Sequence, residues 1–238
     1  MTGAAGEDYA VAGDELVARV RGLWGEVATA AFPADGVKVV CAPGSRVCPP
    51  GWVGSVTVGG AGLVTVPSED LLGRVWAAVD QYGIDGLAGS LRVTDTLGPA
   101  LLAYADADGF RPAHGPVEWL EPGDPDLRAL LDAVDPAEAR ESGLEGNDSR
   151  LAVVRDAGRV VAAAGWQDWP AGTAHVGVLT ATGHRGRGLA GQVAGAVTAA
   201  ALERRLLPQW RARVVPSQRV ARRLGYRTLG RQFSVHPA

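Results

Sequence analysis

The sequence has little of what a disulfide framework, a zinc site or a membrane span requires. Its 238 residues include two cysteines, Cys41 and Cys48, and no Cys/His cluster surrounds them, so free thiols are expected and metal ligation is not. The longest apolar runs are broken by Gly, Arg or Asp well short of the roughly 20 residues that cross a bilayer. No charged segment followed by an apolar one opens the chain. A cytoplasmic protein without a membrane partner is therefore expected.

Positive charge is scarce in the first half of the chain. Residues 1–114 carry 7 cations and 13 anions, whereas residues 115–238 carry 16 cations and 13 anions, and the formal net charge is -3. Lys38 is the only lysine, so every other cation is an arginine. The acidic balance, together with the lack of aromatic residues interleaved with the cations, argues against nucleic acid as a partner.

Hydrophobic residues make up 47% of the chain, which is ample for a packed core. The helical spacing of apolar residues predicts a helix over residues 13–32, and Ser68 is placed to cap a second helix that runs to about Gln81. Shorter apolar runs predict strands at 37–41 and 99–104 and a hairpin over 52–66. This first lobe is mixed α and β, and no catalytic motif is recognisable in it.

A charged segment with several Gly and Pro residues, 105–116, predicts a boundary between two domains, 1–114 and 115–238. In the second lobe, strands are expected at 117–120, 151–154, 160–166 and 174–180, with Asp124 capping one helix and Pro136 starting another. Short loops make these strands antiparallel neighbours. A helix from Arg187, a strand over 209–215, a helix capped by Ser217 and a strand over 226–235 complete an α+β lobe.

One stretch, from Val176 to Gly191, joins an apolar strand to a helix through a turn rich in Gly and Arg. Such a junction directs unpaired N–H groups and the positive end of a helix dipole at one point, which favours an anion, most naturally a phosphate. Glycines let ligand oxygens approach the backbone, and arginines add charge-assisted donors. In this turn those residues are Arg185, Gly186, Arg187, Gly188 and Gly191.

The spacing of Gly186, Gly188 and Gly191 also matches a dinucleotide-binding fingerprint. That fingerprint needs an acidic residue at the end of the next strand, and the strand over 209–215 ends without one. It also needs parallel crossovers, whereas the strands before the turn are expected to form an antiparallel meander. A nucleoside-triphosphate loop is disfavoured further, because no Gly-Lys-Ser/Thr follows the glycines. A structural turn that holds no ligand remains an alternative.

Two motifs extend the interpretation to the whole second lobe. The pattern Arg185-x-x-Gly188-x-Ala190 resembles the Gln/Arg-x-x-Gly-x-Gly/Ala signature of the GNAT N-acetyltransferase superfamily, and residues 217–226 resemble its second motif, a Ser followed by a helix that ends in Leu-Gly-Phe/Tyr. The resemblance covers about residues 115–237. It implies a mixed, mostly antiparallel sheet flanked by helices, beside a smaller N-terminal α+β lobe that could be a degenerate GNAT-like unit.

The resemblance also implies a cosubstrate, acetyl-coenzyme A, which lies where two parallel strands splay apart. Its diphosphate would rest on the glycine turn, and a backbone N–H of Val178 or Leu179 would stabilise the charge that develops on the thioester oxygen when an amine attacks. The residues implied in binding are Val178, Leu179, Thr180, Arg185, Gly186, Arg187, Gly188, Leu189, Ala190, Gly191 and Ser217.

The sequence departs from the family pattern where a Tyr acid and an Asn are common, because Ala221 and Val214 stand there. Water, Ser217 or Tyr226 would replace the acid, although a coenzyme thiol with a pKa near that of Cys, about 8.5, can leave without one. His175, Glu141 and Asp168 are candidates for the base, with no preference among them. The structural alternatives are a His packed on the sheet's far face, a solvated helix charge, and a strand end beside core tryptophans.

The predicted activity is therefore transfer of an acetyl group from the thioester to the primary amine of a small molecule or a peptide. The alternative is a non-catalytic acyl-coenzyme A-binding regulatory module, because the missing Tyr and Asn would also mark lost chemistry. The first lobe would then do regulatory or partner work. In an enzyme it would wall off the acceptor site or form a homodimer.

Overall fold

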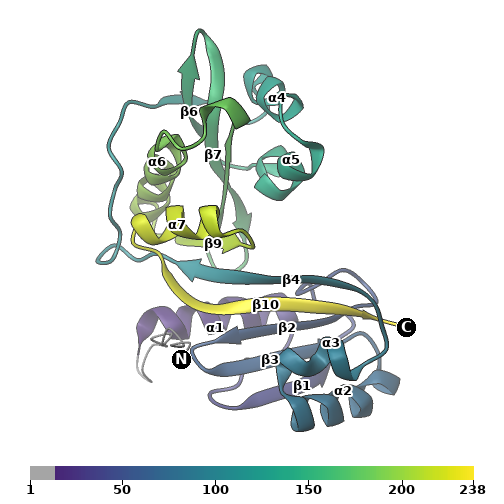
Figure 1. Cartoon of the computed structure of the whole chain (residues 1–238). Coiled ribbons are helices and arrows are strands. Elements are labelled where there is room, and N and C mark those ends of the chain that lie inside the picture. Colours follow the sequence, from purple (N-terminus) through teal and green to yellow (C-terminus); the bar gives the residue numbers. More distant parts are fainter. Residues whose placement is uncertain (1–13) are drawn as a thin grey trace, which may run out of the picture. The chain divides into compact units, whose positions relative to one another are not determined.

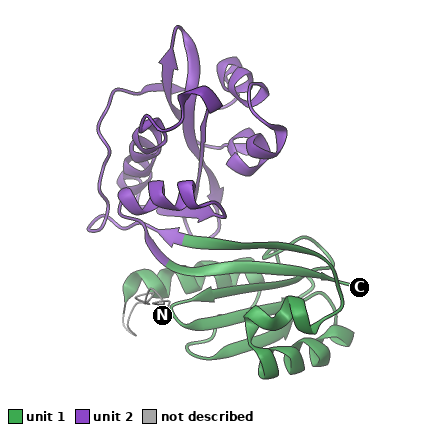
Figure 2. Cartoon of the chain, in the orientation of Figure 1, with its two compact units in different colours: residues 1–102, 229–238 green, residues 103–228 purple. Residues whose placement is uncertain are grey.

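The computed structural model describes residues 14–238 and divides the chain into two compact units (Figure 2). Unit 1 comprises the residues up to 102 and residues 229–238, and unit 2 comprises residues 103–228. The sequence predicted a single boundary after residue 114. The chain instead enters unit 2 within the strand β4 (Val93–Tyr104) and leaves it within β10 (Arg227–Pro237).

The segment 105–116, predicted as the domain boundary, belongs to unit 2 and packs on the end of helix α7 (Val215–Arg223). The Arg111 N–H donates to the Leu224 carbonyl oxygen at 2.9 Å. A Cβ built on Gly225 would lie 2.0 Å from the carbonyl oxygen of Gly109, so only glycine allows this approach.

Unit 1 has a sheet with the strand order β1-β3-β2-β10-β4 (Figure 1). β1 is parallel to β3, and β2 is antiparallel to both β3 and β10. Helix α1 (Glu15–Ala28) buries Val20, Leu23 and Trp24, which the helical spacing had placed on one face; the predicted start at residue 13 lies outside the described residues. The remaining elements are β1 (Val37–Cys41), β2 (Val53–Val58), β3 (Ala61–Val66), α2 (Glu69–Tyr82), η1 (Ile84–Gly86) and α3 (Leu87–Ser90).

Unit 2 has the strand order β9-β8-β7-β6-β5. Its strands β5, β6, β7 and β8 pair antiparallel, and β8 pairs parallel with β9. The elements are β5 (Glu118–Leu120), α4 (Pro125–Asp132), α5 (Pro136–Ser142), η2 (Leu144–Gly146), β6 (Leu151–Asp156), β7 (Arg159–Trp169), β8 (Thr173–Thr180), η3 (Thr182–His184), α6 (Leu189–Glu203), β9 (Leu207–Ala212) and α7.

Helices cover both faces of the unit 2 sheet (Figure 1). On one face, the leucines of α4 pack with Leu144, Leu151 and Leu179. On the other face, α6 buries Val193 and Val197 against alanines of β6 and β7. The sheet therefore has an α4/α5 face and an α6/α7 face, and every β8 side chain points to one of the two.

The predicted fold class is confirmed: the chain is α+β, and its sheet is mostly antiparallel. Asp124 caps α4 as predicted, since its carboxylate accepts from the Asp126 N–H at 2.9 Å. The predicted role of Ser217 as a helix cap is wrong. Helix α7 begins at Val215, two residues before Ser217, because Pro216 favours the first turn of a helix. Val214 therefore takes the capping position.

The two cysteines are free thiols, and burial raises the pKa of Cys48 to about 11. Among residues 14–238, no helix is both long enough and apolar enough to cross a membrane. Within the same residues, no group of three or more His, Cys, Asp or Glu side chains is placed to hold a metal ion.

Candidate functional site

The strands β8 and β9 pair at their beginnings and then separate. β8 pairs with β7 at eight positions, from Thr173 to Thr180, but it pairs with β9 at only three. The last pair in the parallel register is His175 with Gln209. Beyond it, the edge of β8 that faces β9 has no strand partner within the described part of the chain. We call this opening the β8–β9 gap.

The hydrogen bonds to β7 determine which backbone groups face the β8–β9 gap. Ala181 N–H donates to the Val161 carbonyl oxygen at 2.9 Å, and Thr180 lies opposite Ala162 in the register. Because N–H groups alternate along an antiparallel strand, those of residues 177 and 179 point to β7 and those of residues 178 and 180 point into the gap. Val178 therefore presents its N–H to the gap, and Leu179, the other residue named from the sequence, does not.

The glycine turn after β8 is open and its amides are unused. Gly186 and Gly188 adopt φ of 78° and 82°, and a Cβ built on either would meet no atom within 4 Å. Helix α6 starts with Gly188 as its N-cap and without a side-chain cap. Within residues 14–238, no acceptor takes a hydrogen bond from the N–H groups of residues 186–191. This is the arrangement that binds an anion at a helix N-terminus.

Charged and orphaned polar groups surround the turn. Arg185 donates to the Thr180 carbonyl oxygen at 3.2 Å and forms an ion pair of 2.6 Å with Glu138 of α5. His184 Nε2 lies 2.9 Å from a carboxylate oxygen of Asp156. The buried atoms Thr180 Oγ1 and His184 Nδ1 have no hydrogen-bond partner among the described residues. Buried polar atoms are normally satisfied, so these two fit a ligand that brings its own polar groups.

The five catalytic candidates divide between the two faces of the sheet. His175 lies on the α4/α5 face together with α5, which carries Glu141. The other three, Asp168, Ser217 and Tyr226, lie with the tryptophans and helices of the α6/α7 face. Because strand side chains alternate, Trp166 and Trp169 also point to opposite faces, so the single aromatic wall that their sequence suggested does not exist.

On the α6/α7 face, each of the three candidates forms a hydrogen bond with a neighbouring side chain. Asp168 accepts from the Trp166 indole N–H and Ser217 accepts from the Trp210 indole N–H, each at 2.9 Å. Tyr226 is 4% exposed, its hydroxyl lies 2.7 Å from Thr198 Oγ1, and burial raises its pKa well above the ordinary value. A phenol so enclosed is poorly placed to protonate a thiolate in the gap.

Glu141 is engaged in an ion pair. Its carboxylate accepts from Arg213, the residue that follows β9, with the Arg213 Nε 3.0 Å from Oε1. Both side chains are about half exposed, at 48% and 46%. A carboxylate already held by a guanidinium is a weaker proton acceptor than a free one, so Glu141 is the less suited of the two candidates on this face.

His175 is held at the closed end of the gap. Its Nδ1 lies 2.9 Å from Oε1 of Gln209, and its ring stacks on Trp169 with the centroids 4.5 Å apart. Burial, together with the positive charge of Arg211, lowers the pKa of His175 to about 3, against the opposing effect of the Gln209 hydrogen bond. The ring is therefore neutral at physiological pH.

Sequence reasoning missed Gln209, which lies directly beside His175 and is fully buried. Its Nε2 donates to the Tyr104 hydroxyl at 2.9 Å, so both ends of the amide have a partner. The signal was present in the sequence as a single amide side chain inside the apolar run Leu207-Pro208-Gln209-Trp210. A buried amide needs partners, but its position in the sequence does not tell which ones.

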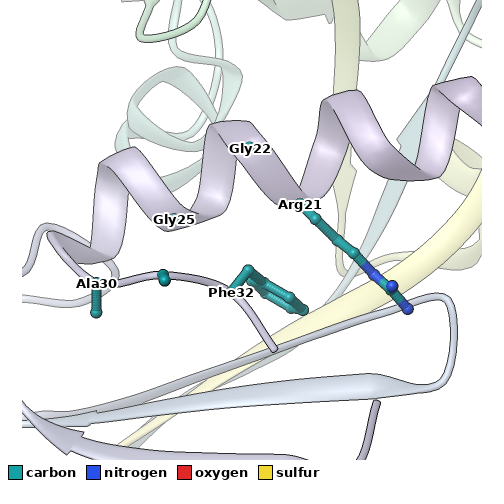
Figure 3. Close-up of a pocket in the computed structure, with 6 residues that line it drawn as sticks. Arg21, Gly22, Gly25, Ala30 and Phe32 are labelled. Atoms are coloured by element: carbon teal, nitrogen blue, oxygen red, sulfur yellow. The ribbon is translucent and has the colours of Figure 1, made fainter. Parts of the chain in front are cut away.

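Unit 1 has a shallow hollow beside α1, lined by Arg21, Gly22, Gly25, Ala30, Ala31 and Phe32 (Figure 3). Its only charged side chain, Arg21, donates to the carbonyl oxygens of Ala34, Val58 and Gly59. These bonds tie α1 to the β2–β3 hairpin and give Arg21 a structural role. The anion-binding features of unit 2 have no counterpart in this hollow.

Residues of the C-terminal half match a known protein family. Residues 151–232 match the family model of GNAT acetyltransferases, which confirms the resemblance of the C-terminal half. The fold is similar to an acetyltransferase of the GNAT family from Colwellia psychrerythraea, with 14% identity, coverage of 73% of this chain and 75% of that chain, and a TM-score of 0.50. A GNAT-family structure from Novosphingobium aromaticivorans is 25% identical over 62% of this chain and 67% of that chain, with a TM-score of 0.47. No curated protein matches the sequence.

Proposed function

Because residues 151–232 form a GNAT acetyltransferase domain, we propose that the chain is an N-acetyltransferase that uses acetyl-coenzyme A to acetylate a primary amine. One observation carries the proposal: the β8–β9 gap, with the Val178 N–H facing it, leads directly to a glycine turn whose amides have no acceptor among the described residues. The domain's fold supports acyl transfer in general. Coenzyme use and the amine acceptor are the proposed part.

The residues of the turn fit the diphosphate of the coenzyme. The N–H groups of residues 186–191 and the positive end of the α6 dipole would bind its oxygens, and the open space at Gly186 and Gly188 admits them. Arg185 and Arg187 would add charge-assisted hydrogen bonds. Leu189, Ala190 and Gly191 act here through their backbones.

The β8–β9 gap would receive the rest of the coenzyme, which when bound supplies an acetyl group activated as a thioester. Val178 would donate its N–H to the oxygen that gains negative charge, and a fixed donor of this kind lowers the barrier because it needs no reorganisation. Neither Tyr226 nor Ala221, which is buried in the α6/α7 core, offers an acid to the gap. A thiol with a pKa of about 8.5 can leave as a thiolate without one.

The experiment is release of free coenzyme A from acetyl-coenzyme A across a panel of amines, with Gly188→Trp as the blocked control. Turnover in the wild type that the Gly188→Trp variant abolishes supports the proposal. Tight coenzyme binding without turnover on any amine would instead support the alternative, a regulatory module that binds acyl-coenzyme A. Absence of both binding and turnover would refute the two together.

A further inference from the structure

We propose that His175 is the residue that receives the acceptor amine, and that Gln209 is a positioning residue that fixes the His175 ring with Nε2 directed at that amine. The inference rests on the proposed function, because it takes the thioester to end where the β8–β9 gap closes. That closing point is the pair His175 and Gln209, the last in the parallel register.

The location of His175 sets it apart from the other β8 residues on the α4/α5 face. These are Thr173, His175, Gly177 and Leu179, since side chains alternate along a strand, and Thr173 is fully buried at the paired start of β8. Gly177 is covered by α5, because a Cβ there would lie 2.3 Å from the Ser142 carbonyl oxygen, and Leu179 is buried among leucines of α4. His175 is thus the polar side chain on this face that lies at the last paired position of β8 and β9, where the gap closes.

The hydrogen bond to Gln209 decides the tautomer of His175. A carboxamide oxygen only accepts, so the proton of the neutral imidazole must lie on Nδ1, which faces Gln209 Oε1 at 2.9 Å. The lone pair of the ring is then on Nε2. In the structure Nε2 of Gln209 donates to the Tyr104 hydroxyl, and this orientation of the amide places Oε1 at Nδ1 of His175. We take Gln209 in this orientation as the acceptor that holds the Nδ1–H tautomer.

The surroundings keep the ring neutral and in place. Trp169 stacks on it with an interplanar angle of 27°, and Nε2 of His175 makes no hydrogen bond with the described residues. The charged group that acts on the ring is Arg211 of β9. The hydroxyl of Tyr104 of β4 contacts the ring only indirectly, through the amide of Gln209. Burial, together with the charge of Arg211, lowers the pKa of His175 to about 3, so Nε2 stays a hydrogen-bond acceptor. The same positive charge opposes an ammonium ion, so the site selects the neutral form of the amine.

The chemistry then balances without a further reactant. With one amine N–H held by His175 Nε2, the nitrogen lone pair forms a bond to the thioester carbonyl carbon. The carbon–sulfur bond breaks, its electron pair remains on sulfur, and the proton that nitrogen loses ends on the thiol. The products are the amide and free coenzyme A. His175 orients the nucleophile in this scheme and does not store the proton.

The first test is independent of activity. In a protein labelled with 15N-histidine, the His175 signals, identified by their loss in His175→Gln, are expected to show the Nδ1–H tautomer and no titration between pH 5 and 8. Gln209→Glu places a carboxylate on the Nδ1–H, so His175 is expected to titrate at higher pH than in the wild type. The control Gln167→Leu removes an amide that lies opposite His175 but bonds to the Gly143 carbonyl oxygen, and it is expected to change neither property.

The second test uses hydroxylamine, a weakly basic amine, as the acceptor and measures coenzyme binding separately by calorimetry. His175→Gln and Gln209→Leu are expected to lower kcat at least tenfold while coenzyme A affinity stays within twofold of wild type, and Gln167→Leu is expected to change neither. If both variants kept the kcat of the wild type, or if the wild type showed the Nε2–H tautomer, the inference about His175 and Gln209 would be overturned and the proposed function would stand. Failure of the wild type to bind coenzyme A would overturn the proposed function as well.

Discussion

Replacement of Gly188 by alanine tests the glycine turn most directly. The residue has φ of 82°, in the left-handed region that costs an L-residue with a Cβ about 1 kcal/mol. A Cβ there meets no atom within 4 Å, so backbone strain is the whole effect in the absence of ligand. We expect the free energy of unfolding of unit 2 to fall by about 1 kcal/mol.

Coenzyme binding should fall independently of that strain. The added methyl group lies at the start of α6, in the space through which diphosphate oxygens would reach the unused amides. A hydrogen bond to a charged group contributes about 1.5–3 kcal/mol, so losing one lowers affinity at least tenfold. Titration calorimetry with coenzyme A measures this, alongside urea unfolding of the same samples.

Two matched glycines separate the effects. Gly60, in the β2–β3 turn, has φ of 83° and equally open surroundings, so Gly60→Ala should cost unit 1 a similar free energy without changing coenzyme affinity. Gly183 has open surroundings but no positive φ, so Gly183→Ala should leave stability unchanged. Wild-type coenzyme affinity in Gly188→Ala would refute the assignment of the turn as the diphosphate site.

Four further predictions concern unit 2. Glu138→Gln frees Arg185 from an exposed ion pair worth up to about 1 kcal/mol, so coenzyme A should bind up to about fivefold more tightly at low salt. The control Glu145→Gln releases only Arg128 and should leave the affinity unchanged. Equal affinities in the wild type and both variants would contradict this. Gly177→Ala forces a Cβ against a backbone carbonyl oxygen and should lower the free energy of urea unfolding by about 1–3 kcal/mol, and an unchanged midpoint would show that α5 does not cover β8 there. Tyr226→Phe should cost about 1 kcal/mol of stability for the lost Thr198 hydrogen bond yet keep its turnover, and a large loss of kcat would restore Tyr226 as an acid. Because folding lowers the pKa of His175 to about 3, the stabilising effect of the neutral ring is present above pH 6.5 and is lost as pH falls toward 3. Between pH 7 and 5, the free energy of unfolding should fall by roughly 2 kcal/mol more in the wild type than in His175→Asn. Urea midpoints that change equally with pH in the two proteins would exclude the pKa shift.

Local patterns were sufficient to predict most elements of the fold. Strand β1 has the predicted bounds, 37–41, because an isolated apolar run between turns has one plausible structure. The strand predicted at 99–104 is longer, because β4 begins at Val93. Its first residues are mostly exposed and carry no apolar alternation, so they form a strand by backbone pairing, which periodicity does not report.

The glycine turn was predictable for the same reason, and the pairing of His175 with Gln209 was not. Gly186 and Gly188 lie two residues apart, and their conformational freedom is a property of the residue type. His175 and Gln209 are 34 residues apart and become neighbours only through the parallel pairing of β8 with β9. Whether His175 faced a site or the core depended on that register, since a shift by one residue would send the ring to the α6/α7 face.

Helix α5 connects the two sides of the gap through charge. Glu138 and Glu141 lie one turn apart on it, and they hold Arg185, in the turn that follows β8, and Arg213, which follows β9. The helix has no fully buried side chain, so these exposed ion pairs, each worth up to about 1 kcal/mol, add to the packing of Ala139 and to the contact of Ser142 with Gly177. A diphosphate on the turn would compete with Glu138 for Arg185. Coenzyme binding should therefore loosen the element that covers β8 beside His175, which couples the two ends of the proposed site.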